Sequence, residues 1–187
     1  MVALVIGAGP AGLMAADEIA AHGHSVLIAE AKPSPARKLL MAGKSGLNLT
    51  KAESREACLA AFGAAGPRLR PMIDVFGPDE VMSWAKGLGQ TIFTGSTGRV
   101  FPEAMKASPL LRSWLSRLER RGVLLERSWR WTGWHSASSC FETPEGPRRV
   151  SAQATVLACG GASWARLGSD GSWAAHFPKS QTAPFQP

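Results

Sequence analysis

The stretch Val2-Ala3-Leu4-Val5-Ile6-Gly7-Ala8-Gly9-Pro10-Ala11-Gly12 decides the fold class of this chain. The apolar run predicts a buried strand, and Gly7 stands where the chain must reverse, which favours a residue tolerant of positive φ. Pro10 suits the first position of a helix, and Gly12 is predicted to pack against the strands. Gly9 lacks a Cβ, so a phosphate can approach its backbone. The following helix would offer unpaired N–H groups and the positive end of its dipole, which predicts an anion site.

A second apolar run, residues 24–30, is predicted as the next parallel strand and ends in Glu30. Glu30 stands 18 residues after Gly12, close to the spacing at which dinucleotide-binding folds place an acid that accepts hydrogen bonds from a ribose hydroxyl. An acid there disfavours a 2′-phosphate. Strand, glycines, helix and acid together predict a dinucleotide site. The alternative is a structural glycine turn in another α/β protein.

Composition narrows the protein class. Hydrophobic residues make up 45% of the 187 residues and charged residues 19%, which indicates a globular rather than a disordered chain. No run has the length of a membrane span, and the apolar N-terminus lacks the basic region of a signal peptide. We therefore expect a cytoplasmic protein without a membrane partner. Cys58, Cys140 and Cys159 are widely spaced, which favours ordinary reduced thiols over a zinc site or a dithiol pair.

The formal net charge of +7 raises the alternative of nucleic-acid binding. No helix-turn-helix, zinc-finger or RNA-platform pattern accompanies it. Arg117, Arg120 and Arg121 are instead predicted to form the solvated side and basic C-terminal end of a helix, where positive charge suits the dipole.

The middle of the chain predicts loops and helices. Residues 31–37 form a loop with two prolines, and residues 38–50 predict neither a clear helix nor a strand, so they form either a ligand-contacting segment or a plain surface loop. Helices are predicted over 52–62 and 67–88, with Pro67 and Pro78 as starts. A hairpin over 91–102 and an amphipathic helix over 106–121 follow.

The last third predicts a return to the sheet. Residues 123–126 are the third parallel strand, 129–152 an antiparallel meander, and 154–158 a strand that enters a second glycine turn at 159–161. Trp129, Trp131 and Trp134 either offer a stacking surface or cover one face of the meander, and packing is favoured. The predicted fold class is α/β with a parallel sheet. A β-meander in place of a crossover helix is typical of FAD-binding flavoproteins.

Five segments resemble those of the bacterial HI0933-like flavoproteins, also called the BaiN-like or aminoacetone-oxidase-like group of NAD(P)/FAD-dependent oxidoreductases. These segments are residues 5–12, 37–50, 98–102, 106–108 and 158–163. Residues 5–12 are shared by many flavoproteins, whereas 37–50 are far more specific. The resemblance implies FAD as the cofactor and a Rossmann-like FAD-binding domain with a parallel sheet and a β-meander crossover.

The resemblance also implies the cofactor contacts. The pyrophosphate and the adenosine ribose would meet the first turn and the acid, at Gly7, Gly9, Pro10, Ala11, Gly12, Glu30 and Ala31. Arg37 and Lys38 would lie near the phosphates or ribose, and Ala158 and Gly160 near the adenosine end. The path toward the flavin would be lined by Gly43, Ser45, Gly46, Asn48 and Thr50.

The expected domain organisation follows the family. Residues 1–175 form the FAD-binding domain, with a helical excursion over about 52–121 and the meander over about 129–152, and residues 176–187 begin a linker. Family members are roughly twice as long, so the resemblance implies that this chain ends before an inserted β-rich domain and a C-terminal flavin clamp. Many members carry glycine-arginine-cysteine in the loop where this chain has Lys44-Ser45-Gly46-Leu47, so cysteine chemistry proposed for that loop does not apply.

No catalytic residue or metal site is indicated, because the histidines are scattered and a flavin carries hydride chemistry itself. Three hypotheses follow. The first is an FAD-dependent oxidoreductase of an unknown small-molecule substrate, with NAD(P)H open as its reductant and no nucleic-acid partner. The second is a nucleotide-binding module without catalysis. The third is an RNA- or anion-binding protein that uses its basic face.

Overall fold

The computed structural model describes residues 1–185, so the last two residues of the predicted linker 176–187 lie outside the described part of the chain. The chain divides into two compact units. The first unit comprises Met1–Leu39 and the chain from Ser116 onward, and the second comprises Leu40–Leu115. The predicted domain bounds, 1–175 with a linker beyond, stay a prediction.

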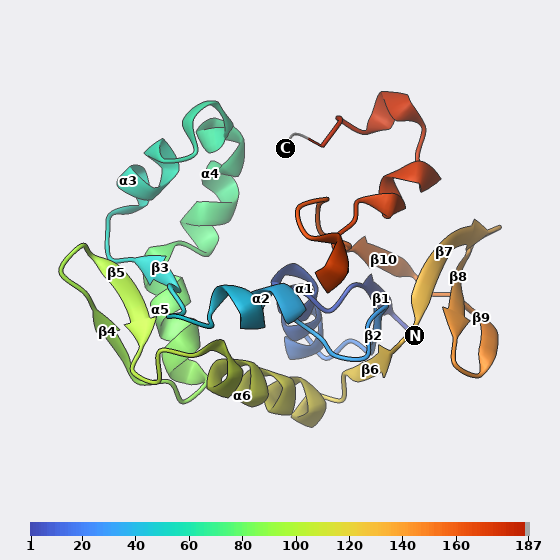
Figure 1. Ribbon diagram of the computed structural model, residues 1–187, viewed down its shortest axis with the longest axis horizontal. Helices are drawn as coiled ribbons and strands as arrows, with labels where there is room; N and C mark the ends of the chain where they lie inside the picture. Colours follow the sequence, from blue (N-terminus) through green and yellow to red (C-terminus); the bar gives the residue numbers. More distant parts are fainter. Residues whose placement is uncertain (186–187) are drawn as a thin grey trace. The chain divides into compact units, whose positions relative to one another are not determined.

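A four-stranded parallel sheet forms the centre of the first unit (Figure 1). Its order is β10 (Ala154–Leu157), β1 (Ala3–Ile6), β2 (Val26–Glu30) and β6 (Leu124–Arg127). Every residue of β1 is buried, as a central strand covered on both faces requires. Helix α1 (Pro10–Ala21) follows β1 directly. The predicted α/β class and the three predicted parallel partners of this sheet are confirmed.

The meander packs its apolar side against the core of this sheet. Strands β7 (Arg130–His135), β8 (Ser138–Thr143) and β9 (Gly146–Val150) pair in antiparallel order, as predicted for residues 129–152. Trp131 and Phe141 join Leu4, Ile6, Leu27 and Ala29 in one buried cluster. Trp131 is 8% exposed and therefore packs as expected, whereas Trp134 is 43% exposed and contacts the ring of Phe177 edge-on.

The second unit is helical with a small antiparallel sheet of order β3 (Thr50–Lys51), β5 (Arg99–Pro102) and β4 (Ile92–Thr94). Its core includes Trp84 and Trp114, whose ring centroids lie 4.7 Å apart in an edge-to-face contact. The predicted hairpin over 91–102 and the helix starts at Pro67 and Pro78 are confirmed within one residue. The elements not yet placed are α2 (Arg37–Ala42), α3 (Arg55–Ala60), η1 (Gly63–Ala65), α4 (Gly66–Val75), α5 (Pro78–Gly87), α6 (Ala107–Arg120), η2 (Ala165–Leu167), η3 (Ser172–His176) and η4 (Lys179–Gln181).

The prediction of no regular structure over 38–50 is wrong at both ends. Residues 37–42 form α2, and Thr50 begins β3 beside Val100. Ala36, at φ +53°, turns the chain after two prolines, and its N–H donates to the carbonyl of Ala8. The residues that follow are good helix formers, so the helix begins once this turn has been made. The unusual backbone of Ala36 is the reason that local pattern did not reveal the start of α2.

The predicted basic C-terminal end of this helix is confirmed and Arg120 is exposed, but the predicted solvation of Arg117 and Arg121 is wrong. Both guanidinium groups pair with Asp17 of α1, whose side chain is 2% exposed. Arg121 also donates to the Asp17 carbonyl at 2.9 Å. Arg117 and Arg121 are therefore committed to ion pairs with Asp17 inside the first unit. None of the helices between residues 1 and 185 combines the length and apolar character that a membrane span needs.

Candidate functional site

The first glycine turn leaves an open approach at one position and is closely packed at two others. Gly7 has φ +105°, and a Cβ there would lie 2.5 Å from the carbonyl oxygen of Ala158. A Cβ on Gly12 would lie 1.9 Å from the carbonyl oxygen of Gly7, so this residue lets helix and turn touch. A Cβ on Gly9 would meet no described atom within 4 Å. The approach to the backbone of Gly9 is therefore free.

Helix α1 begins at this open position. Gly9 is its N-cap in an extended conformation, Pro10 lies in the first turn, and no side chain among residues 1–185 caps the helix. The N-terminal N–H groups of a helix need partners from outside the helix, and an anion provides them together with favourable dipole energy. The turn and the helix thus form one anion-accepting end.

Glu30 lies at the carboxyl end of β2 and is held against the same turn. Its Oε2 accepts a hydrogen bond from Ala8 N at 2.8 Å, and its Oε1 accepts one from Lys32 N at 2.9 Å. Each carboxylate oxygen has capacity for a further hydrogen bond. The side chain is therefore pre-oriented and can still accept donors from a ligand hydroxyl.

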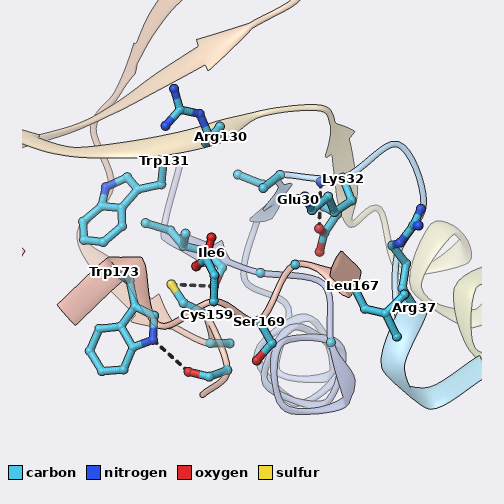
Figure 2. Close-up of a pocket in the computed structure, with 18 of the residues that line it drawn as sticks. Ile6, Glu30, Lys32, Arg37, Arg130, Trp131, Cys159, Leu167, Ser169 and Trp173 are labelled. Carbon is cyan, nitrogen blue, oxygen red and sulfur yellow. Dashed lines mark hydrogen bonds between the residues drawn. The ribbon is translucent and has the colours of Figure 1, made fainter. Parts of the chain in front are cut away.

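A pocket of about 200 Å³ opens at these strand ends, and all the residues that line it belong to the first unit. Ligands of open α/β sheets bind at the carboxyl ends of strands, which is where this pocket lies. Figure 2 shows Glu30 and Lys32 near one end, with Trp131 and Trp173 toward the other. The predicted residues that line the pocket are Gly7, Gly9, Pro10, Glu30, Ala31, Arg37, Lys38, Ala158 and Gly160.

The remaining predicted residues lie elsewhere. Ala11 and Gly12 belong to α1 behind the turn, and Gly12 is buried. The second unit contains Gly43, Ser45, Gly46, Asn48 and Thr50. A Cβ on Gly43 would lie 2.7 Å from the Cβ of Ala107, so this glycine permits close packing at the start of α6. Their roles as cofactor contacts stay predictions.

Four cationic side chains line the pocket, namely Lys32, Arg37, Lys38 and Arg130. Arg37 donates to Ser34 Oγ at 3.4 Å, and its buried Nε has no hydrogen-bond partner among residues 1–185. A buried donor without a partner is costly, and a ligand oxygen would satisfy it. Arg130 pairs with Glu142 of β8 at the surface. The excess of cations over Glu30 and Asp170 suits an anionic ligand.

Two parts of the pocket lining are not predicted by the sequence patterns, namely residues 129–131 and residues 167–173. Residues 129–131 line the pocket because Trp129 N donates to the carbonyl of Glu30 at 2.9 Å, which holds the start of the meander beside β2. Their position after the strand that pairs with β2 was a usable signal. The other wall comes from residues 167–173, which lie more than 130 residues from the first turn along the chain. No local sequence pattern predicts that contact.

Cys159 lines the pocket at the end of β10, and its Sγ lies 3.7 Å from the carbonyl oxygen of Ile6. Burial, and secondarily the nearby Glu30 carboxylate, raise the pKa of this thiol to about 11. The thiol is therefore neutral near pH 7 and is a poor nucleophile. Between residues 1 and 185 no cluster of His, Cys, Asp or Glu is arranged to hold a metal ion.

A relative of established activity is similar to most of this chain. The 3-dehydro-bile acid delta(4,6)-reductase of Clostridium scindens is 30% identical over 171 residues, which cover 90% of this chain and 41% of the reductase. This chain therefore spans well under half the length of that relative.

Two solved structures share the fold at low sequence identity. The 3-ketosteroid-delta4-(5alpha)-dehydrogenase from Rhodococcus jostii RHA1 has a TM-score of 0.65 and 15% identity, covering 87% of this chain and 46% of that protein. A flavocytochrome c3 fumarate reductase has a TM-score of 0.64 and 18% identity, covering 86% and 33%. These likenesses establish the Rossmann-type fold.

The family model described as the HI0933-like protein Rossmann domain matches residues 1–183. That range includes the glycine turn, Glu30, the meander and both walls of the pocket. The chain belongs to the HI0933-like Rossmann-domain family.

Proposed function

We propose that this chain is the FAD-binding part of a flavin-dependent oxidoreductase and that its pocket holds the adenosine diphosphate half of FAD. The observation that carries the proposal is the open approach to Gly9, at the uncapped start of α1, beside a fixed carboxylate at Glu30. A pyrophosphate next to a ribose presents this combination of anionic oxygens and hydroxyl donors.

Each part of the ligand has a matching part of the pocket. The pyrophosphate meets the N–H groups of α1 and the cations Arg37 and Lys38. The ribose hydroxyls donate to Glu30. The planar base meets the aromatic end of the pocket at Trp173, whose indole N–H donates to the carbonyl of Gly160. The largely buried Trp131 lines the same end. This arrangement leaves the flavin end of the cofactor to residues beyond the pocket, among which 43–50 remain proposed.

When bound, FAD supplies the hydride chemistry. The described residues bind and orient it, and Cys159 stays protonated beside it. The substrate is proposed only as a small organic molecule, and NAD(P)H remains the proposed source of reducing equivalents. The bile acid reductase supports a reductive role, since it matches 90% of this chain. We propose a cytoplasmic location on the basis of the reduced thiols.

A second candidate is a nucleotide-binding module without catalysis. It is supported by the fact that the first unit alone lines the pocket, so nucleotide binding needs no further element. The RNA-binding alternative is weakened because Arg117 and Arg121 are engaged by Asp17.

The test is the cofactor content of the purified chain. We expect visible flavin absorbance, either as purified or after reconstitution with FAD and removal of free ligand. A protein that stays colourless after reconstitution would exclude the proposal for this chain. Bleaching of the bound flavin by NADH or NADPH, followed by reoxidation with an electron acceptor, would favour the oxidoreductase. Bound flavin that no reductant reaches would favour the module without catalysis.

A further inference from the structure

One wall of the pocket is a small loop closed on itself, which we term the wall segment, Trp164–Trp173. Trp164 N donates to Ser169 O at 3.1 Å, and Ser169 N donates to Trp164 O at 3.2 Å, with η2 between them. The wall-segment residues in the pocket lining are Leu167, Gly168, Ser169, Asp170, Ser172 and Trp173. These two backbone hydrogen bonds join residues of the wall segment to each other. Hydrogen bonds from side chains attach the segment to the rest of the first unit.

Ser169 makes the most enclosed of these attachments. It is 2% exposed, its Oγ donates to the carbonyl of Gly161 at 2.7 Å, and it accepts a hydrogen bond from Lys38 Nζ at 2.9 Å. A hydroxyl has one donor and two acceptor sites, so the direction runs from Lys38 through Ser169 to Gly161. A second attachment is the indole N–H of Trp173, which donates to the carbonyl of Gly160 at 2.8 Å.

Lys38 therefore contacts the wall segment and also lines the pocket. A Cβ on Gly160 would lie 3.0 Å from Ser169 Oγ and 3.8 Å from Lys38 Nζ, so the ammonium sits beside the second glycine turn. Its partners among residues 1–185 are Ser169 and, more weakly at 3.4 Å, the exposed Ser163. An ammonium has three N–H groups, which leaves one for a ligand oxygen in the pocket that Lys38 lines.

We propose that Ser169 is a positioning residue that couples the wall segment to dinucleotide binding through Lys38, an inference that rests on the proposed function. A phosphate oxygen that accepts the third N–H of Lys38 fixes the ammonium, and the fixed ammonium holds Ser169 in place. A bound dinucleotide thus keeps the wall segment closed. Coupling between two sites is reciprocal. Loss of the Ser169 hydroxyl should therefore weaken dinucleotide binding and reduce the protection of the wall segment by the ligand, both by the same factor.

Trypsin can report opening of the wall segment directly, because Arg166 lies in η2 and is exposed. The 187-residue chain is digested with and without saturating FAD, and cleavage after Arg166 is compared with cleavage after the exposed Arg148 of β9. In the wild type, we expect FAD to slow cleavage at Arg166 about tenfold and to leave cleavage at Arg148 unchanged.

Variants of Ser169, Ser163 and Lys38 then test whether the hydrogen bond between Lys38 and Ser169 couples the wall segment to FAD binding. We expect Ser169→Ala to raise the Kd for FAD about tenfold, consistent with loss of a hydrogen bond to a charged group, and to reduce the FAD protection of Arg166 by the same factor. Ser163→Ala is the matched control and should change either quantity less than twofold, since that contact is long and exposed. Lys38→Met should abolish the protection, and adding Ser169→Ala to it should cause no further loss.

The outcomes separate the two proposals. A wild-type chain that does not bind FAD overturns the proposed function, and the coupling falls with it. A wild-type chain that binds FAD without protection of Arg166 overturns the coupling alone. The coupling is also overturned if Ser169→Ala binds FAD like the wild type. It is overturned likewise if the losses of FAD protection caused by Lys38→Met and Ser169→Ala add in the double variant. If Ser169→Ala does not fold, the Lys38→Met digestion still decides.

Discussion

The three glycines of the first turn have different surroundings, and this separates structural roles from ligand contact. Gly7 has a positive φ, and Gly12 touches the carbonyl of Gly7, so neither tolerates a side chain. Gly9 has φ −78° and ψ 179°, an extended backbone that any residue adopts, and open space on its Cβ side. Packing therefore does not account for the lack of a side chain at Gly9, which supports the proposal that a ligand approaches its backbone.

We expect Gly9→Val to abolish FAD binding while the chain stays folded, because the new side chain occupies the phosphate approach and its Cβ meets no atom of residues 1–185 within 4 Å. Its melting temperature should stay within about 2 °C of the wild type, which corresponds to less than 1 kcal/mol. Gly87→Val is the control, since a Cβ there also meets no atom within 4 Å and Gly87 ends α5 in the second unit. Calorimetric titration with FAD measures the effect, and unchanged affinity of Gly9→Val would refute the phosphate position.

Cys159 yields a pH-dependent prediction. Its pKa of about 11 means that the thiolate fraction at pH 8 is about a hundredfold below that of a thiol with pKa 9. Alkylation of Cys159 by iodoacetamide, followed by peptide mass spectrometry, should be slower than that of free glutathione. Its rate should still rise steeply with pH between 9 and 10, where a rate that levels off would contradict the assignment.

The same shift affects stability with a defined sign. The folded thiol keeps a proton that the unfolded chain releases above about pH 9, so this contribution to stability is present below that pH and is lost as the pH rises toward 11. We expect the decline of the melting temperature over this range to be smaller in Cys159→Ala. An equally steep decline of the melting temperature in both proteins would mean that deprotonation of Cys159 does not cause the decline.

At the scale of elements, hydrophobic periodicity and turn residues predicted most of the fold. The β1–α1–β2 unit, the meander and β10 each follow from local pattern, because a buried parallel strand is a continuous apolar run and a turn needs glycine. Helix α2 is not predicted because its start depends on the positive φ of Ala36, a backbone conformation that an alanine in the sequence does not indicate. The ion pairs of Asp17 and the contact of Lys38 with Ser169 were missed because they join residues 100 or more positions apart.

The attachment of α6 to α1 is testable by mutation. Asp17→Ala removes the carboxylate with which Arg117 and Arg121 both pair, in a place where neither arginine is fully exposed. We expect the free energy of unfolding in urea to fall by about 3 kcal/mol. Glu119→Ala removes an exposed carboxylate from the same helix and should change it by less than about 0.5 kcal/mol. A similar small change for Asp17→Ala would show that the ion pairs do not stabilise the fold.

At the scale of the whole molecule, the site is assembled from two distant portions of the sequence. Residues from the first 39 positions supply the turn, Glu30 and three of the four cations. Residues after 128 supply Arg130 with the meander, the turn after β10 and the wall segment. The sequence patterns therefore predict the lining residues of β1–α1–β2, and the family resemblance adds Ala158 and Gly160 after β10. The wall formed by the meander and the wall segment depend on tertiary contacts that the sequence does not predict. Because the first unit alone lines the pocket, it should recognise the adenosine diphosphate portion of FAD by itself.

The most direct test of this account is a competition titration on the wild-type chain loaded with FAD. ADP should displace FAD, whereas FMN, which lacks the adenosine portion, should not at the same concentration. Flavin and tryptophan fluorescence follow the displacement, since Trp131 and Trp173 line the pocket. Displacement of FAD by FMN but not by ADP would contradict the placement of the adenosine diphosphate half in this pocket.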